Sequence, residues 1–116
     1  MQHEITEAIP LLDEQGNLNE AGYAKKLLPV YQRDRIRVNK TRIKEWDYYL
    51  ITDGHIGLAL TIADNGYMGL DSVSFLDFDG KWEKTSSRMR ALPLGRTQLP
   101  ESSAEGATEI SKGGYA

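Results

Sequence analysis

A chain of 116 residues with a net charge of −3 at pH 7 has room for one small domain at most. It contains no cysteine, which excludes disulfide bonds, thiolate metal sites and a cysteine nucleophile. No apolar run approaches the roughly 20 residues of a membrane-spanning helix, and the acidic segment Met1–Glu7 lacks the apolar centre of a signal peptide. These features predict a soluble, cytoplasmic protein with no membrane span.

The charges are unevenly distributed along the chain. Residues 1–24 carry a net charge of −5, residues 25–44 carry +7, and residues 45–116 carry −5. A basic block of this kind can attract phosphate or nucleic acid. Because the whole chain is acidic and has no recognisable nucleic-acid motif, we expect the block to neutralise the acidic segments around it and predict no nucleic-acid partner.

The first 32 residues are predicted to be irregular. Pro10 disfavours helix just before it, and residues 13–17 have the composition of a turn. A short helical turn is expected at residues 20–26. Residues 33–40 alternate apolar and polar side chains, which predicts a half-buried strand.

Three strand-like runs follow, at residues 43–52, 55–64 and 67–79, and they dominate the sequence. The dipeptides Asp53-Gly54 and Asn65-Gly66 separate them. Both dipeptides favour two-residue type I′ hairpin turns, because such turns need positive φ at both central residues. The sequence therefore predicts a three-stranded antiparallel meander.

Two-residue turns would fix which residues face each other: Asp47 opposite Leu60, and Leu60 opposite Asp71. One face, the predicted core face, is then largely apolar and carries Tyr49, Ile51, Ile56, Leu58, Leu60, Ile62, Val73 and Phe75. The second face places large side chains over small ones, with Trp46, Tyr48 and Leu50 over Thr61, Ala59 and Gly57.

The remainder of the chain is less regular. The apolar residues of the third run change parity, which predicts a β-bulge near residues 75–77. Asp79-Gly80 predicts another tight turn, so the meander is expected to span residues 33–84. Residues 85–106 show no periodicity and are predicted to form a loop. Residues 107–116 are predicted to begin a hairpin, with a short strand before a glycine turn.

A hairpin turn followed by two residues has no return strand, and the sheet has too few companions to cover two apolar faces. We therefore expect the chain to be the N-terminal part of a larger β-barrel or sandwich. The alternative is a complete small protein that forms a homo-oligomer to cover its sheet.

Five segments together resemble the N-terminal portion of the domain of unknown function 2804 family: Pro10–Asn19, Gly22–Pro29, Arg42–Tyr49, Ala59–Gly69 and Pro93–Arg96. Members of that family are longer than this chain. The resemblance implies a relation to lipocalin-like and hydroxyneurosporene-synthase-like proteins, which include carotenoid hydratases and tocopherol cyclase. It implies an all-β fold, an antiparallel meander forming the opening strands of a lipocalin-like β-barrel, with lipid-like or isoprenoid ligands. It assigns no role to any residue.

Two aspartates interrupt the predicted core face. Asp47 and Asp71 flank Leu60 on neighbouring strands, with their Cβ atoms about 10 Å apart, and Glu45 lies one pair further along. A carboxyl group against an apolar surface can stay protonated and act as a general acid. These residues are therefore the candidate catalytic groups. Alternatively, they lie solvated at a barrel rim or pair with basic residues of the preceding segment, Arg42 and Lys44.

The candidate ligand-binding residues are aromatic and aliphatic side chains of the strands: Trp46, Tyr48, Tyr49, Leu58, Leu60 and Phe75. Ordinary core packing explains the same pattern. His3 and His55 have no metal-ligand spacing, and Asp77–Gly80 lacks the later ligands of a calcium loop. We expect neither a metal nor a cofactor.

Three functions are compatible with the sequence. The first is a binding module for a lipid-like or isoprenoid small molecule. The second is an enzyme of the hydratase or cyclase type that uses Asp47 or Asp71 as its acid. The third is a structural fragment without activity of its own.

Overall fold

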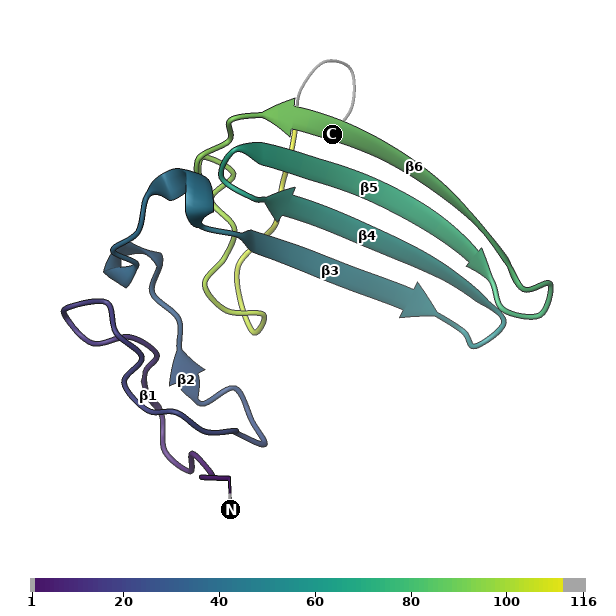
Figure 1. Cartoon of the computed structure of the whole chain (residues 1–116). Helices are drawn as coiled ribbons and strands as arrows, with labels where there is room; N and C mark the ends of the chain where they lie inside the picture. Colours follow the sequence, from purple (N-terminus) through teal and green to yellow (C-terminus); the bar gives the residue numbers. More distant parts are fainter. Residues whose placement is uncertain (1, 112–116) are drawn as a thin grey trace. The chain divides into compact units, whose positions relative to one another are not determined.

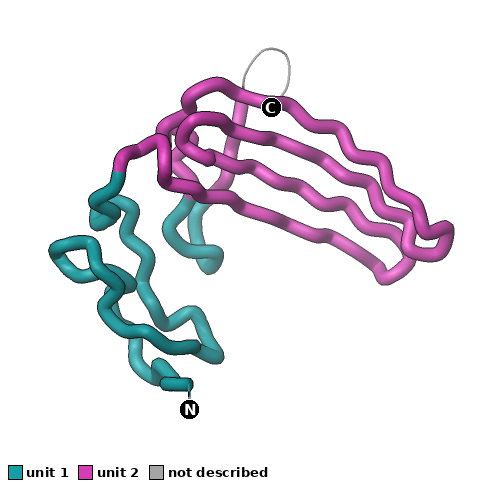
Figure 2. The backbone as a smooth tube through the Cα atoms, viewed as in Figure 1, with its two compact units in different colours: residues 1–38, 100–106 teal, residues 39–99, 107–116 magenta. Residues whose placement is uncertain are grey.

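The computed structural model describes residues 2–111 (Figure 1). The backbone divides into two compact units, residues 1–38 with 100–106 and residues 39–99 with 107–116 (Figure 2), and the single domain expected from the sequence stays a prediction. The first unit is built on short backbone pairings. The second unit contains the long strands, and it carries the candidate site.

In the first unit, β1 (Ile9–Pro10) pairs in parallel with β2 (Pro29–Val30). A second parallel pairing joins Glu4 to Tyr23, where the amide of Ile5 donates to the Tyr23 carbonyl at 2.8 Å. Ile5 is buried. Apart from such short pairings, residues 2–32 form turns, bends and irregular backbone, as the sequence predicts.

The helical turn predicted at residues 20–26 does not form. Gly22 lies so close to the backbone of residue 3 that a Cβ atom on it would be 2.6 Å from the His3 carbonyl oxygen. The glycine therefore permits the close approach of two extended segments, and the backbone hydrogen bonds of Tyr23 go to that neighbour instead of to a helix.

The turn predicted at residues 13–17 is confirmed. Oδ1 of Asp13 accepts hydrogen bonds from the amides of Gln15 at 2.9 Å and Asn17 at 2.8 Å. Gly16 has a φ of +84°, which glycine adopts without steric cost. The hydrogen bond from the Asn17 amide lowers the pKa of Asp13 below its ordinary value.

The strand predicted at residues 33–40 is wrong. Two short 3₁₀ helices, η1 (Arg33–Arg35) and η2 (Lys40–Arg42), stand at its two ends. The Asn39 side chain accepts from the amide of Thr41 at 3.0 Å and caps η2. Local hydrogen bonds of this kind compete with a sheet ladder, and they prevail here over the alternating apolar pattern.

The second unit contains one four-stranded antiparallel sheet in the order β3-β4-β5-β6 (Figure 1). Its strands are β3 (Glu45–Thr52), β4 (Ile56–Asp64), β5 (Met68–Asp77) and β6 (Trp82–Ala91). The prediction of an all-β antiparallel meander is confirmed. The sheet is open, with β3 and β6 at its edges.

The register differs by two residues from the prediction in both hairpins. Thr52 pairs with Gly57 instead of His55, and Asp64 pairs with Gly69, so four residues separate the paired ends of each hairpin. Type I′ turns need two residues with positive φ, but only the glycines have it, Gly54 at +94° and Gly66 at +75°. In the first turn, Oδ1 of Asp53 instead accepts hydrogen bonds from the backbone amides of His55 and Ile56.

A shift of two residues leaves every side chain on its predicted face, because side chains alternate with a period of two. The predicted core face is called face A from here on, and the opposite face is called face B. Both faces carry exposed apolar side chains, such as Leu60 on face A and Trp46 on face B, which are 38% and 63% exposed. The expectation of two apolar faces is confirmed.

The β-bulge predicted near residues 75–77 is wrong. Over Met68–Asp77, β5 pairs with β4 and β6 without interruption. The change of parity has another cause: Leu76 belongs to face B, where it lies opposite Gly57. Phe78 follows the strand, and its ring lies over the same glycine, 3.2 Å from where a Cβ atom would stand.

The tight turn at Asp79-Gly80 is confirmed, and the Gly80 amide donates to Asp77 Oδ1 at 2.7 Å. The loop predicted for residues 85–106 is wrong over its first seven residues, because β6 continues to Ala91. This edge strand is mostly polar and exposed, so it lacks the apolar alternation by which strands are predicted. Residues 107–111 form no strand, and the predicted glycine turn lies outside the described residues.

Candidate functional site

Face A carries two adjoining apolar rows that run across the sheet. One row consists of Ile51, Leu58 and Phe75, and the other of Tyr49, Leu60 and Val73. All six side chains are 38% to 65% exposed. Burying a large apolar side chain contributes about 1.5–3 kcal/mol of favourable free energy. This much exposed apolar surface therefore indicates an interaction surface.

The next two rows of face A consist mostly of charged side chains. The nearer row is Asp47–Ile62–Asp71–Arg88, and the farther row is Glu45–Asp64–Gly69–Arg90. The predicted alignment of Asp47 with Asp71 therefore exists, although the residue between them is Ile62 instead of Leu60. Equal shifts of two residues in both hairpins cancel, which keeps the two aspartates in one row.

Asp71 is buried and forms an ion pair with Arg90. Nε of Arg90 donates to Oδ2 at 2.8 Å, and Nη2 donates to Oδ1 at 2.8 Å. Two parallel hydrogen bonds of this kind fix both groups and compensate the carboxylate charge. Asp71 thus pairs with a basic residue, which was the alternative to a catalytic role. The partner is Arg90 of β6 and not Arg42 or Lys44 of the segment before β3.

Asp64 is the most deeply buried acid of the described residues, with 1% of its surface exposed. It joins the sheet to the loop after β6, since its Oδ2 accepts from the Gly95 amide at 2.8 Å and from the Thr97 hydroxyl at 3.0 Å. The same hydroxyl accepts from Nη1 of Arg90 at 3.0 Å. Asp64, Thr97, Arg90 and Asp71 therefore form one continuous hydrogen-bonded network.

Asp47 is half-buried on the edge strand β3, and its Oδ2 accepts a hydrogen bond from the hydroxyl of Thr108. The Tyr49 hydroxyl lies 3.5 Å from the same Thr108 oxygen. These contacts hold the segment after residue 106 against face A. Glu45 lies one row beyond Asp47, in register with Asp64.

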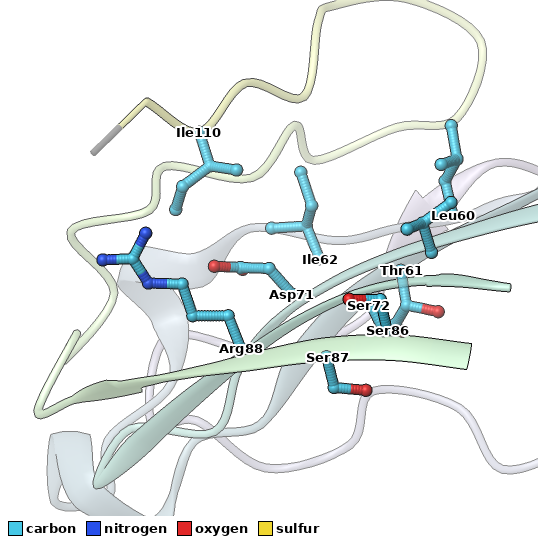
Figure 3. Close-up of a pocket in the computed structure, with 10 residues that line it drawn as sticks. Leu60, Thr61, Ile62, Asp71, Ser72, Ser86, Ser87, Arg88 and Ile110 are labelled. Atoms are coloured by element: carbon cyan, nitrogen blue, oxygen red, sulfur yellow. The ribbon is translucent and has the colours of Figure 1, made fainter. Parts of the chain in front are cut away.

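A pocket of about 590 Å³ lies where this segment crosses face A (Figure 3). Leu60, Ile62 and Val73 contribute apolar surface, and Asp71 and Arg88 lie at one end. Ile110 lies on the side toward which Ile62, Asp71 and Arg88 project. The pocket is therefore mainly apolar with a charged end, which is the usual composition of a small-molecule site.

A second pocket, of about 430 Å³, lies at the hairpin end of the same face. Its apolar lining includes Ile51, Ile56, Leu58 and Phe75. Leu58 and Phe75 form the row beside Leu60 and Val73, which line the first pocket. The two pockets thus adjoin along β4 and β5 and form one apolar track.

Within residues 2–111, no group of three or more His, Cys, Asp or Glu side chains is placed to hold a metal ion. In the same part of the chain, no helix is long and apolar enough to cross a membrane. Neither finding identifies a ligand.

Comparison with protein families gives a match over nearly the whole chain. The model of the family described as a domain of unknown function (DUF2804) matches residues 2–116. The chain belongs to this family. No curated protein and no solved structure gives a significant match. Family membership confirms the resemblance noted from the sequence, and the relation to lipocalin-like proteins stays a prediction.

The candidate ligand-binding residues divide between the two faces. Tyr49, Leu58, Leu60 and Phe75 lie together on face A, whereas Trp46 and Tyr48 lie on face B, as their parity requires. Leu58, Leu60 and Phe75 line the two pockets of face A, whereas Tyr49, Trp46 and Tyr48 line neither of them. The candidate catalytic residues Asp47, Asp71 and Glu45 all lie on face A, and a catalytic role for them stays a prediction.

Sequence reasoning missed Arg88, Arg90 and Ile110. The two arginines lie within a segment predicted to be a loop, so no register could place them beside Asp71. Their spacing of two residues in a polar run is the one signal that could have placed them on a common strand face. For Ile110 there was no signal, because residues 107–111 approach face A without forming a strand.

Proposed function

We propose that the protein binds a lipid-like or isoprenoid small molecule along face A, within a lipocalin-like β-barrel. The observation that carries this proposal is the apolar track formed by the two adjoining pockets. A long apolar ligand lying over Leu58, Leu60, Val73 and Phe75 would remove these exposed side chains from water. Each such side chain contributes about 1.5–3 kcal/mol when fully buried.

The form of the sheet supports the same proposal. A β-sheet with an apolar face is stable only when another layer covers that face. A barrel would place face A inside, where a ligand completes the packing. The Thr108–Asp47 contact and the position of Ile110 already bring one segment over the polar end of the track.

Protein purified from cells under native conditions tests the proposal. Native mass spectrometry is expected to show a fraction with added mass, and solvent extraction should release a lipid or isoprenoid. A face that is covered only by other protein surfaces would give apo-protein with no bound small molecule, and this result would contradict the proposal.

A second candidate is a hydratase or cyclase, in which the acid protonates an alkene and the resulting cation is captured by water or by a second double bond of the substrate; the position of Asp47 favours it. The Asp47 carboxylate borders the apolar rows and accepts from a hydroxyl group, whereas Asp71 is held by a guanidinium. Asp71 is therefore the weaker candidate for the acid. Asp47→Asn should lower turnover of a polyene substrate by at least about 100-fold while the circular dichroism spectrum is unchanged. Equal turnover would remove Asp47 from this role.

A further inference from the structure

We propose that residues 107–111 form a strap that closes over the ligand of face A, with Thr108 as its latch and Ile110 as its contact with the ligand. This inference rests on the proposed function and concerns how the same site retains its ligand. It assigns roles to two residues that lie outside the sheet.

The side chains of the strap alternate between the sheet and the solvent. Thr108 and Ile110 are half-buried, whereas Ala107, Glu109 and Ser111 are exposed. Alternation of this kind is typical of an extended backbone that lies against a surface. The strap belongs to the same compact unit as the sheet (Figure 2), so its half-buried side chains are directed at face A.

The latch is a side-chain contact on the edge strand β3. The Thr108 hydroxyl donates to Oδ2 of Asp47, and the Tyr49 hydroxyl lies 3.5 Å from the same Thr108 oxygen. A hydrogen bond to a carboxylate is roughly twice as strong as one between neutral groups. Residues 107–111 form no strand with the sheet, so side-chain contacts hold the strap in place. Removing the Thr108 hydroxyl should therefore release it.

Ile110 lies further across the sheet, over the first pocket. Two residues of extended backbone cover about 6.6 Å, and neighbouring strands lie about 4.8 Å apart. The step from Thr108 to Ile110 is thus long enough to lead from β3 to the middle strands. There Ile110 lines the pocket together with Leu60 and Ile62 (Figure 3). A ligand in this pocket would lie between the sheet and the Ile110 side chain.

This arrangement lets the strap control how long the ligand stays bound. While the latch is closed, Ile110 covers the apolar chain of the ligand and shields it from water. Segments without backbone pairing open more easily than the strands beneath them, so the strap can lift while the sheet stays folded. Loss of the latch should act mainly on the dissociation rate, where most affinity differences between related complexes arise.

The test uses cis-parinaric acid, a long polyene that fluoresces in apolar surroundings, bound to the whole chain. Dissociation is followed by stopped-flow fluorescence after mixing with an excess of oleic acid. Thr108→Val keeps the shape of the side chain and removes the hydroxyl, whereas Thr108→Ser keeps the hydroxyl. Both variants leave the Asp47 carboxylate in place. Affinity is compared between Ile110→Ala and the control Ser111→Ala, which truncates an exposed neighbour on the strap.

Thr108→Val should release the probe about tenfold faster than wild-type protein, since a hydrogen bond to a charged group contributes at least that factor. Thr108→Ser should release it at the wild-type rate. Ile110→Ala should bind the probe about tenfold more weakly, and Ser111→Ala should bind it as wild-type protein does. Equal dissociation rates for Thr108→Val and wild-type protein, or equal affinities for Ile110→Ala and Ser111→Ala, would overturn the strap while the proposed function stands. Failure of wild-type protein to bind the probe would overturn the proposed function, and the role of the strap with it.

Discussion

The carboxylate of Asp71 and the guanidinium of Arg90 form a two-point ion pair across β5 and β6, with both hydrogen bonds at 2.8 Å. Their side chains are 7% and 14% exposed. The pair is not directly cross-strand, since Asp71 lies opposite Arg88 and Arg90 lies opposite Gly69. The missing side chain at Gly69 leaves room for the arginine, whose guanidinium carbon would lie 2.8 Å from a Cβ atom there.

Removing one member of this pair should destabilise the sheet. Asp71→Ala is expected to lower the free energy of unfolding by about 3 kcal/mol, because it leaves the Arg90 charge buried without its partner. Urea denaturation followed by circular dichroism measures the change. The control is Asp79→Ala, which breaks the exposed pair with His55 and should leave the unfolding midpoint nearly unchanged. Equal shifts in the two variants would contradict this account.

Removing the Asp64 carboxylate should destabilise the loop after β6. Its replacement by alanine leaves the amides of Gly66 and Gly95 without their acceptor, at a cost of about 3 kcal/mol in total. Asp64→Asn keeps one acceptor oxygen and should lose less stability. The Gly95 amide should exchange its hydrogen faster in Asp64→Ala than in the wild-type protein, and hydrogen-exchange measurements report this local change. Unchanged protection of that amide would show that other contacts hold the loop.

The first hairpin turn should contribute a pH-dependent stability through Asp53. The hydrogen bond from the Ile56 amide lowers the pKa of Asp53 from its ordinary value of 3.8. A group with a lowered folded-state pKa stabilises the fold above its unfolded pKa, and this contribution is lost as the pH falls through the folded pKa. Asp53→Ala should therefore differ from wild type above about pH 4 and converge with it at lower pH.

Unfolding midpoints in urea at a series of pH values measure this difference. Comparison with Asp53→Ala removes the titration of the other carboxylates, which are common to both proteins. A gap between the two proteins that stays constant down to about pH 2 would show that the charged form of Asp53 contributes no stability of its own.

The faces of the central strands were predictable because alternation survives a register error of two residues. Leu58, Leu60 and Phe75 share face A under either register, and so do Asp47 and Asp71. The turn residues themselves were correctly placed. The type of the first turn was predicted wrongly. The Asp53 side chain accepts two hydrogen bonds that favour a longer turn, and the preference of the Asp-Gly dipeptide does not reveal these bonds.

The polar part of the site was not predictable. Arg88 and Arg90 lie on a strand with few apolar residues, so periodicity gave no indication of a strand, and their positions depend on pairing with β5. At residues 33–40 a strand was predicted that does not form. The apolar and polar residues alternate there, but the segment contains parts of two 3₁₀ helices and pairs with no strand. Hydrophobic pattern thus located the apolar track, while tertiary pairing determined its charged end.

The central claim is that face A, and not face B, binds the apolar ligand. Fluorescence titration with cis-parinaric acid, a fluorescent polyene carboxylate, against Leu60→Gln and Leu50→Gln tests it most directly, because these leucines are 38% and 46% exposed and lie on opposite faces. We expect Leu60→Gln to weaken binding about tenfold, in line with the transfer free energy of a leucine side chain, and Leu50→Gln to leave it unchanged. Equal binding by both variants, or a greater loss in Leu50→Gln, would contradict the claim.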